Sequence, residues 1–80
     1  MNLYYFHIRN GHTILDDVGS RLANIAAVRA EALKASCEML PGVHPDLWNG
    51  VAWRLWVTDG PKATGKTLFT LEFSASVTEA

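Results

Sequence analysis

Only one segment of the chain has the residue spacing of an amphipathic helix, and this limits the possible folds more than any other feature. Apolar residues recur there at intervals of three and four, at Ile25, Val28, Ala32, Ala35 and Met39, and Leu33 and Leu40 widen the same face. Asn24 is placed to cap the start, because its side chain can accept from a free backbone N–H. Pro41-Gly42 is expected to end the helix, since proline disfavours helical geometry in the residue before it. The sequence therefore predicts one helix over Ile25–Met39.

The remaining apolar segments alternate with polar residues, which is typical of strands. We expect strands over Leu3–Arg9, His12–Leu15, Val51–Thr58 and Lys66–Phe73. Asn10-Gly11 favours a two-residue hairpin turn, and 41–50 is expected to be a loop anchored by Leu47 and Trp48. The order β-β-α-β-β predicts an α+β fold, a four-stranded antiparallel sheet with one helix on one face. One domain is expected over residues 1–80, with an ordered core over 2–73 and a fraying tail.

Side-chain alternation assigns the two faces of this sheet. The inner face is expected to hold Tyr4, Phe6, Ile8, Val51, Trp53, Leu55, Val57, Phe69, Leu71 and Phe73. The outer face is expected to hold Tyr5, His7, Arg9, Ala52, Arg54, Trp56, Thr58, Leu68 and Thr70. A face in water is normally polar, whereas this one combines aromatic and aliphatic residues with two arginines. It is therefore the surface most worth testing for function.

Composition excludes several classes of protein. With 80 residues, 49% of them hydrophobic and 19% charged, the chain is neither a disordered tail nor a coiled coil. A net charge of −1 argues against a general nucleic-acid or anionic-membrane binder. The single cysteine, Cys37, excludes an internal disulfide and is expected to be a semi-buried thiol. No signal peptide or membrane-spanning stretch is recognisable, so we expect a cytoplasmic protein.

One motif resembles a nucleotide-binding loop. Residues 60–67, Gly-Pro-Lys-Ala-Thr-Gly-Lys-Thr, match the pattern G-x-x-x-x-G-K-[ST], with Gly60, Gly65, Lys66 and Thr67 as phosphate-binding candidates. That chemistry also needs the N-terminus of a helix after the loop. Here the following residues alternate as a strand does. We therefore expect a flexible hairpin loop.

No other group of residues forms a recognisable catalytic or metal site. The histidines are scattered over different elements, whereas a metal needs three or four converging donors. The adjacent Asp16 and Asp17 are explained by turn chemistry. No serine or threonine lies in a nucleophile-elbow context. We therefore expect no catalytic residues, no metal and no cofactor.

Several segments resemble a family of small proteins of about 80 residues from soil-dwelling alphaproteobacteria. Tyr-Tyr-Phe-His-Ile-Arg-Asn-Gly at 4–11 is similar to its opening Y-F-F-H-V-R-D-G, and 26–32 is similar to its A-A-R-x-E-A helix start. The segment 53–60, with 68–73, is similar to its W-x-V-x-V-x-D ending. The chain departs from the pattern at Ala23, where proline is usual, and in two longer loops. The resemblance implies a bacterial domain of unknown function and supports the fold without supplying a reaction.

The leading hypothesis for function is therefore a non-catalytic interaction module. An aromatic cluster rimmed by arginines resembles the core of a protein interface, which predicts a homodimer or a small protein partner. Its contact residues are expected to be Tyr5, His7, Arg9, Arg54, Trp56, Leu68 and Thr70. The alternative is binding of single-stranded nucleic acid, with aromatic side chains stacking on bases and the arginines contacting phosphate. Phosphate or nucleotide binding at residues 60–67 is a third hypothesis.

Overall fold

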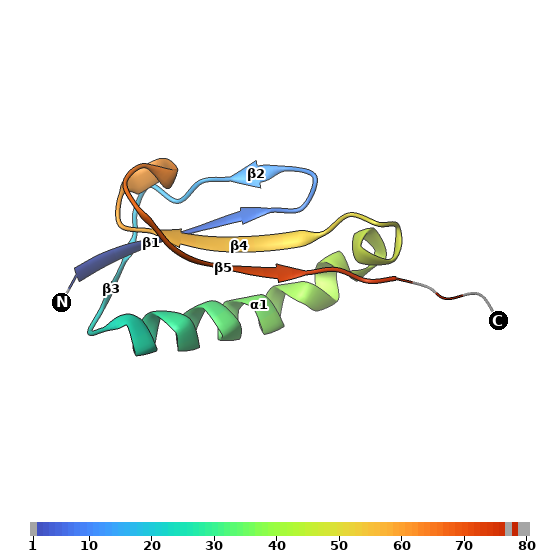
Figure 1. Cartoon of the computed structure of the whole chain (residues 1–80), viewed down its shortest axis with the longest axis horizontal. Coiled ribbons are helices and arrows are strands. Elements are labelled where there is room, and N and C mark those ends of the chain that lie inside the picture. Colours follow the sequence, from blue (N-terminus) through green and yellow to red (C-terminus); the bar gives the residue numbers. More distant parts are fainter. Residues whose placement is uncertain (1, 77, 79–80) are drawn as a thin grey trace.

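The computed structural model describes residues 2–76 and 78, with the backbone alone at residue 44, and contains one sheet and one long helix (Figure 1). The elements are β1 (Asn2–Arg9), β2 (Thr13–Ile14), β3 (Ser20–Leu22), α1 (Ile25–Trp48), β4 (Trp53–Thr58), a 3-10 turn η1 (Pro61–Ala63) and β5 (Thr67–Phe73). The predicted α+β class and the element order are confirmed, with β3 in addition. Of the predicted fraying tail, residues 77, 79 and 80 lie outside the described residues.

The sheet is antiparallel, with the strand order β2-β1-β4-β5. β2 and β3 share the far edge of β1, with Ile8 opposite Ile14 and Asn2 opposite Leu22. β3 has only three residues, too few to produce an alternation signal. The prediction of a two-residue hairpin turn at Asn10-Gly11 is wrong. Arg9 pairs with Thr13, so residues 10–12 form the connection and only Gly11 has a positive φ, of 85°.

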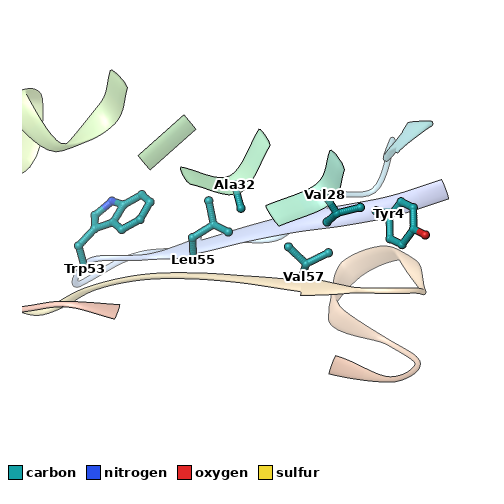
Figure 2. Packing of buried hydrophobic residues seen from close by; sticks show 6 residues of the cluster. All are labelled: Tyr4, Val28, Ala32, Trp53, Leu55 and Val57. Atoms are coloured by element: carbon teal, nitrogen blue, oxygen red, sulfur yellow. The ribbon is translucent and has the colours of Figure 1, made fainter. Parts of the chain in front are cut away.

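The core lies between α1 and one face of the sheet. Its buried members are Tyr4, Val28, Ala32, Trp53, Leu55 and Val57, and Figure 2 shows them meeting between helix and sheet. The predicted inner face is confirmed for the strand residues, but Val51 precedes β4 and is exposed. The buried stripe of α1 is narrower than predicted: Ile25, Leu33 and Met39 are exposed, because one sheet covers only one side of the helix.

The predicted end of the helix is also wrong, because α1 continues through Pro41 and Pro45. Each proline removes one backbone hydrogen bond within the helix. Both prolines are exposed, so water can reach the carbonyl groups left without a partner. Leu40, Val43 and Leu47 continue the apolar stripe and pack against the core, which offsets that cost. The last turns of α1 change direction (Figure 1), and Trp48, predicted as an anchor, is 59% exposed.

A β-bulge changes which residues of β5 lie on the outer face. Val57 pairs with Phe69 but Thr58 pairs with Thr67, which leaves Leu68 as one extra residue. Leu68 is half-buried and packs against the core, so its predicted place on the outer face is wrong. Thr67 lies beside Thr58 in its place. The bulge thus removes one aliphatic side chain from the outer face.

Candidate interaction surface on the outer sheet face

The strand register arranges the outer face in three rows across β1, β4 and β5. The rows are Tyr5–Thr58–Thr67, His7–Trp56–Thr70 and Arg9–Arg54–Glu72. Most of the residues predicted for this surface are therefore brought together. Their exposure differs along the strands. In the first row Thr58 is buried, Tyr5 is half-buried and Thr67 is exposed, whereas the whole of the last row is open to solvent.

His7 is fully buried and holds a chain of hydrogen bonds. The backbone N–H of Asp16 donates to its Nδ1 at 3.0 Å, so the ring proton is on Nε2. That Nε2–H donates to Thr58 Oγ1 at 2.8 Å, and the Thr58 hydroxyl donates to the Gly60 carbonyl at 2.7 Å. Every polar atom of the His7 ring is satisfied inside the protein. His7 is therefore a structural residue and is not available as a contact for a partner.

The half-buried Asp16 is the second member of this polar cluster. Its carboxylate accepts from the backbone N–H groups of Phe6, Val18 and Gly19 at 3.0–3.1 Å. Its backbone carbonyl accepts from the N–H of Lys62 at 2.8 Å. One aspartate thus ties β1, the 16–19 turn and η1 together. Turn chemistry alone does not distinguish the adjacent Asp16 and Asp17, but only Asp16 has these long-range contacts.

The charge states follow from these contacts. Burial lowers the pKa of His7 below its ordinary value, although the nearby Asp16 carboxylate opposes the shift. Burial alone would raise the pKa of Asp16. The N–H groups of Gly19, Phe6 and Val18, together with His7, outweigh that effect and hold the pKa below its ordinary value. The folded protein therefore favours a neutral His7 beside an ionised Asp16.

A loss of stability below about pH 6.5 is the expected consequence, since an unfolded histidine titrates near that value. Because the folded pKa of His7 is lower, the unfolded chain binds a proton that the folded chain does not, and stability falls with pH until His7 itself titrates. Asp16 adds a second loss only below its ordinary pKa of 3.8. NMR titration of the His7 ring checks the assignment, and a pKa at or above 6.5 contradicts it. The control is a His12→Gln variant, which changes an exposed histidine and leaves the contacts of His7 in place. Its urea midpoint is expected to fall with pH as that of the unmodified protein does.

The 16–19 turn covers part of the Tyr5 ring. Its ring lies against the backbone of Gly19, where a Cβ would be only 2.8 Å from Tyr5 Cε2. Gly19 also has a φ of 80°, which side chains rarely adopt. Glycine is therefore required there for two separate reasons. Half-buried beneath this turn, Tyr5 presents much less of its ring than the alternation pattern implies.

The open part of the outer face is centred on Trp56 and two arginines. A hollow of about 350 Å³ is lined by Arg9, Thr13, Arg54, Trp56, Thr67 and Thr70. A second, of about 320 Å³, is lined by Arg9, Gly11, Val51, Ala52, Arg54 and Glu72. Arg54 forms an ion pair with Glu72 at 2.7 Å, and both side chains are about half exposed. Among the described residues that is the only ion pair, so Arg9 supplies the net positive charge of this surface.

Residues 60–67, which match the phosphate-loop motif, do not have the loop-and-helix structure that binds phosphate. After Gly65, residues 67–73 form β5, a strand as the sequence predicts. The Asp59 carboxylate accepts from the Lys66 N–H at 2.7 Å, and the Thr64 N–H donates to the Pro61 carbonyl. Asp59 thus uses an N–H group that a phosphate would require. The hydrogen bond between the Asp59 carboxylate and the Lys66 N–H therefore joins the two ends of this loop.

The other candidate residues form no site among the described residues. No group of three or more metal-ligating side chains occurs in that part of the chain. Cys37 is exposed on α1, so the expectation of a semi-buried thiol is wrong. Over the same residues, the structure contains no helix with the length and apolarity needed to cross a bilayer.

A known protein family matches most of the chain. The model of a family described as a domain of unknown function (DUF6894) matches residues 3–74. No curated protein and no solved structure matches the chain. The matched range includes every helix and strand from β1 to β5 apart from the first residue of β1.

Proposed function

The chain belongs to the family of this domain of unknown function (DUF6894), and we propose that it is a non-catalytic interaction module whose outer sheet face binds a protein partner. The observation that carries the proposal is the open surface around Trp56, Arg9 and Arg54. Tryptophan and arginine are the residue types most often responsible for binding energy at protein interfaces. The rigid sheet holds them in one plane, so binding does not require these strands to become ordered.

The chemistry of the surface favours a partner segment that carries carboxylates next to an apolar side chain. Both hollows are lined by Arg9 and Arg54. The guanidinium group of an arginine binds carboxylate through paired hydrogen bonds. Arg9 is free to do so, whereas Arg54 would exchange its contact with Glu72. Trp56 offers an apolar surface between the threonines of β2 and β5.

Self-association through this same face was the leading expectation from the sequence. It stays a prediction, but the apolar centre on which it depended is smaller. His7 is buried, Tyr5 is half-buried under Gly19, and Leu68 packs into the core. Trp56 alone is not the apolar centre of a typical dimer interface.

Amide chemical shifts of the labelled protein, followed by NMR during titration, test the proposal. Poly-L-glutamate serves as the acidic polypeptide probe and a ten-nucleotide oligothymidylate as the nucleic-acid probe. We expect polyglutamate to shift the amides of Arg9, Arg54, Trp56 and Thr70. Arg9→Glu and Trp56→Ala are each expected to weaken binding at least fivefold. Lys34→Ala, changed on the helix away from the sheet, serves as the matched control and should bind as the unmodified protein does.

Two results would oppose the proposal. Binding of oligothymidylate alone, with a strong dependence on salt, would favour the nucleic-acid alternative, because released counterions dominate such binding. If neither probe shifts outer-face amides, this face is not the contact surface.

A further inference from the structure

The free edge of the sheet is the first of two observations that point to another interaction surface. β5 is the last strand in the order β2-β1-β4-β5, and no described strand pairs with its other edge. It runs for seven residues, contains neither proline nor lysine, and carries a single charge at Glu72. Proteins usually protect edge strands with such residues or with a covering segment. β5 is therefore open to pairing with another strand.

The hydrogen-bonding groups at this edge follow from the register. The Phe6 N–H donates to Asp16, on the side of β1 away from β4. Since opposed residues alternate between bonded and non-bonded pairs, the backbone groups of Val57, opposite Phe6, point toward β5. Those of Phe69, opposite Val57, then point back to β4. By alternation, the N–H and C=O groups of Thr70 and Glu72 lie on the free edge.

The second observation is an exposed apolar stripe on α1. Ala26, Ala30, Leu33 and Cys37 are all exposed, with Leu33 53% exposed. Their spacing of four, three and four residues is that of a coiled-coil seam. At 100° per residue they lie within about 60° of one another. The charged Glu31, Lys34 and Glu38 fall outside this sector, and the exposed Arg29 borders it on the side toward the sheet. The helix therefore has an apolar face in addition to the one that covers the sheet.

The stripe and the free edge lie on the same side of the molecule. The side on which β5 lies follows from the chirality of the residues. Consider the sheet viewed from α1, with β4 running upward and the Val57 side chain pointing toward the viewer. In an L-residue of that orientation the backbone N–H and C=O groups point to the right, so β5 lies to the right of β4. α1 runs downward, since Val28 lies over Val57 and Ala32 over Leu55 (Figure 2). A right-handed helix that runs downward turns clockwise when viewed from its N-terminus. Residues at increasing angle from the buried face therefore point to the right in this view. The stripe is in that sector, above β5.

We infer that a second copy of this chain binds this composite surface, with β5 pairing antiparallel to its counterpart and α1 packing against the other α1. One two-fold axis generates both contacts. The inference goes beyond the proposed function, since it uses a different surface and leaves Arg9 and Trp56 exposed. The outer faces of the two copies would then point in the same direction.

The centres of symmetry of the two contacts coincide, which favours an identical copy as the occupant. Strand pairing centred on Leu71 places Thr70 opposite the other copy's Glu72, and Phe69 opposite its Phe73. Leu71 is level with Leu55, over which Ala32 lies. The helix stripe is symmetric about the midpoint of Glu31 and Ala32. A two-fold axis at that midpoint places Ala30 of one copy against Leu33 of the other, and Ala26 against Cys37. An alanine therefore lies opposite a larger side chain each time.

The spacing of the contact is consistent with a dimer. α1 packs against β4 and β5. Its axis therefore lies about 5 Å from a two-fold axis beside β5, which separates the two helices by about 10 Å, near the usual 8–10 Å of packed helices.

The size of the contact predicts weak association. The helix seam and the strand edge together cover roughly 300 Å². Stable interfaces bury about 800 Å² of accessible surface per partner, so we expect a transient dimer with a dissociation constant in the high micromolar range.

Disulfide trapping tests the geometry, using the native Cys37 as one partner. In an Ala26→Cys variant, the new thiol faces Cys37 of the other copy. At about 200 μM under mild oxidation we expect most of the chain to form a covalent dimer. Glu31→Cys is the matched control, because residue 31 is exposed on α1 outside the stripe. If Ala26→Cys cross-links no faster than Glu31→Cys, the inferred arrangement is wrong.

Light scattering over 5–500 μM tests the association itself without added cysteine. We expect the mass to rise from 8.8 kDa toward twice that value. Leu33→Lys and Thr70→Pro should each weaken the dimer at least tenfold. Thr70→Pro removes only an N–H on the free edge, and circular dichroism checks that each variant is folded. Arg9→Glu should leave the mass unchanged, which separates this inference from the outer-face proposal. A monomer at every concentration would overturn it.

Discussion

A Trp53→Ala variant is expected to show the largest loss of folding stability of the variants discussed below. Trp53 is 1% exposed, and its ring packs edge-on against Phe73 with the ring centres 5.9 Å apart. Truncating a buried tryptophan typically costs about 3–5 kcal/mol, from lost burial and the cavity that remains. A chain of this length has a total stability of roughly 4–12 kcal/mol. Urea unfolding followed by far-UV circular dichroism should therefore show a midpoint far below that of the unmodified protein.

Trp53→Phe separates the packing of the ring from the chemistry of the indole. The Trp53 Nε1 atom is buried and has no hydrogen-bond partner among the described residues. Burying an unpaired donor costs about 1–3 kcal/mol, and phenylalanine removes that donor while keeping an aromatic ring. We expect Trp53→Phe to lose less than about 1.5 kcal/mol, because the relief offsets part of the lost volume. A loss as large as that of Trp53→Ala would mean that the indole N–H has a stabilising role.

Asp16→Ala is expected to have the second largest effect, with a loss of about 2–3 kcal/mol. Its carboxylate accepts three backbone N–H groups, and that of Phe6 is partly buried. Without the carboxylate, the 16–19 turn loses its attachment to β1, and the N–H that fixes the His7 tautomer is no longer held in place. The free energy of unfolding in urea at pH 7.5 measures the loss.

Asp17→Ala is the matched control for this prediction. Asp17 is adjacent in sequence and carries the same charge, but it is exposed. Its replacement should change stability by less than about 0.5 kcal/mol. Equal losses for the two variants would show that the loss of negative charge, and not the contacts of Asp16, is responsible.

Binary patterning predicted the parts of the fold that depend on periodicity. The alternating segments became β1, β4 and β5, and the three-and-four spacing became α1. The inner-face residues of these strands were assigned correctly because side chains alternate strictly in regular strands. β3 and the exact hairpin connection were missed, since two or three residues carry no period.

The local rules failed where distant contacts outweighed them. Pro41 did not end α1, because Leu40, Val43 and Leu47 find apolar partners beyond it. Leu68 did not follow the alternation, since a bulge shifted the register by one residue. His7 was assigned to a contact surface, whereas Thr58 and Asp16, far along the sequence, enclose it. No signal near His7 in the sequence distinguishes these two environments.

The sequence by itself determined the class of the fold, the two faces of the sheet and the absence of a recognisable catalytic motif. Each depends on neighbouring residues, through side-chain direction and backbone preference. Only the tertiary structure decided which outer-face residues are exposed, and that the free edge of β5 and the stripe on α1 face the same side. Exposure and adjacency depend on which segments pack together, and those contacts join residues that lie far apart along the chain.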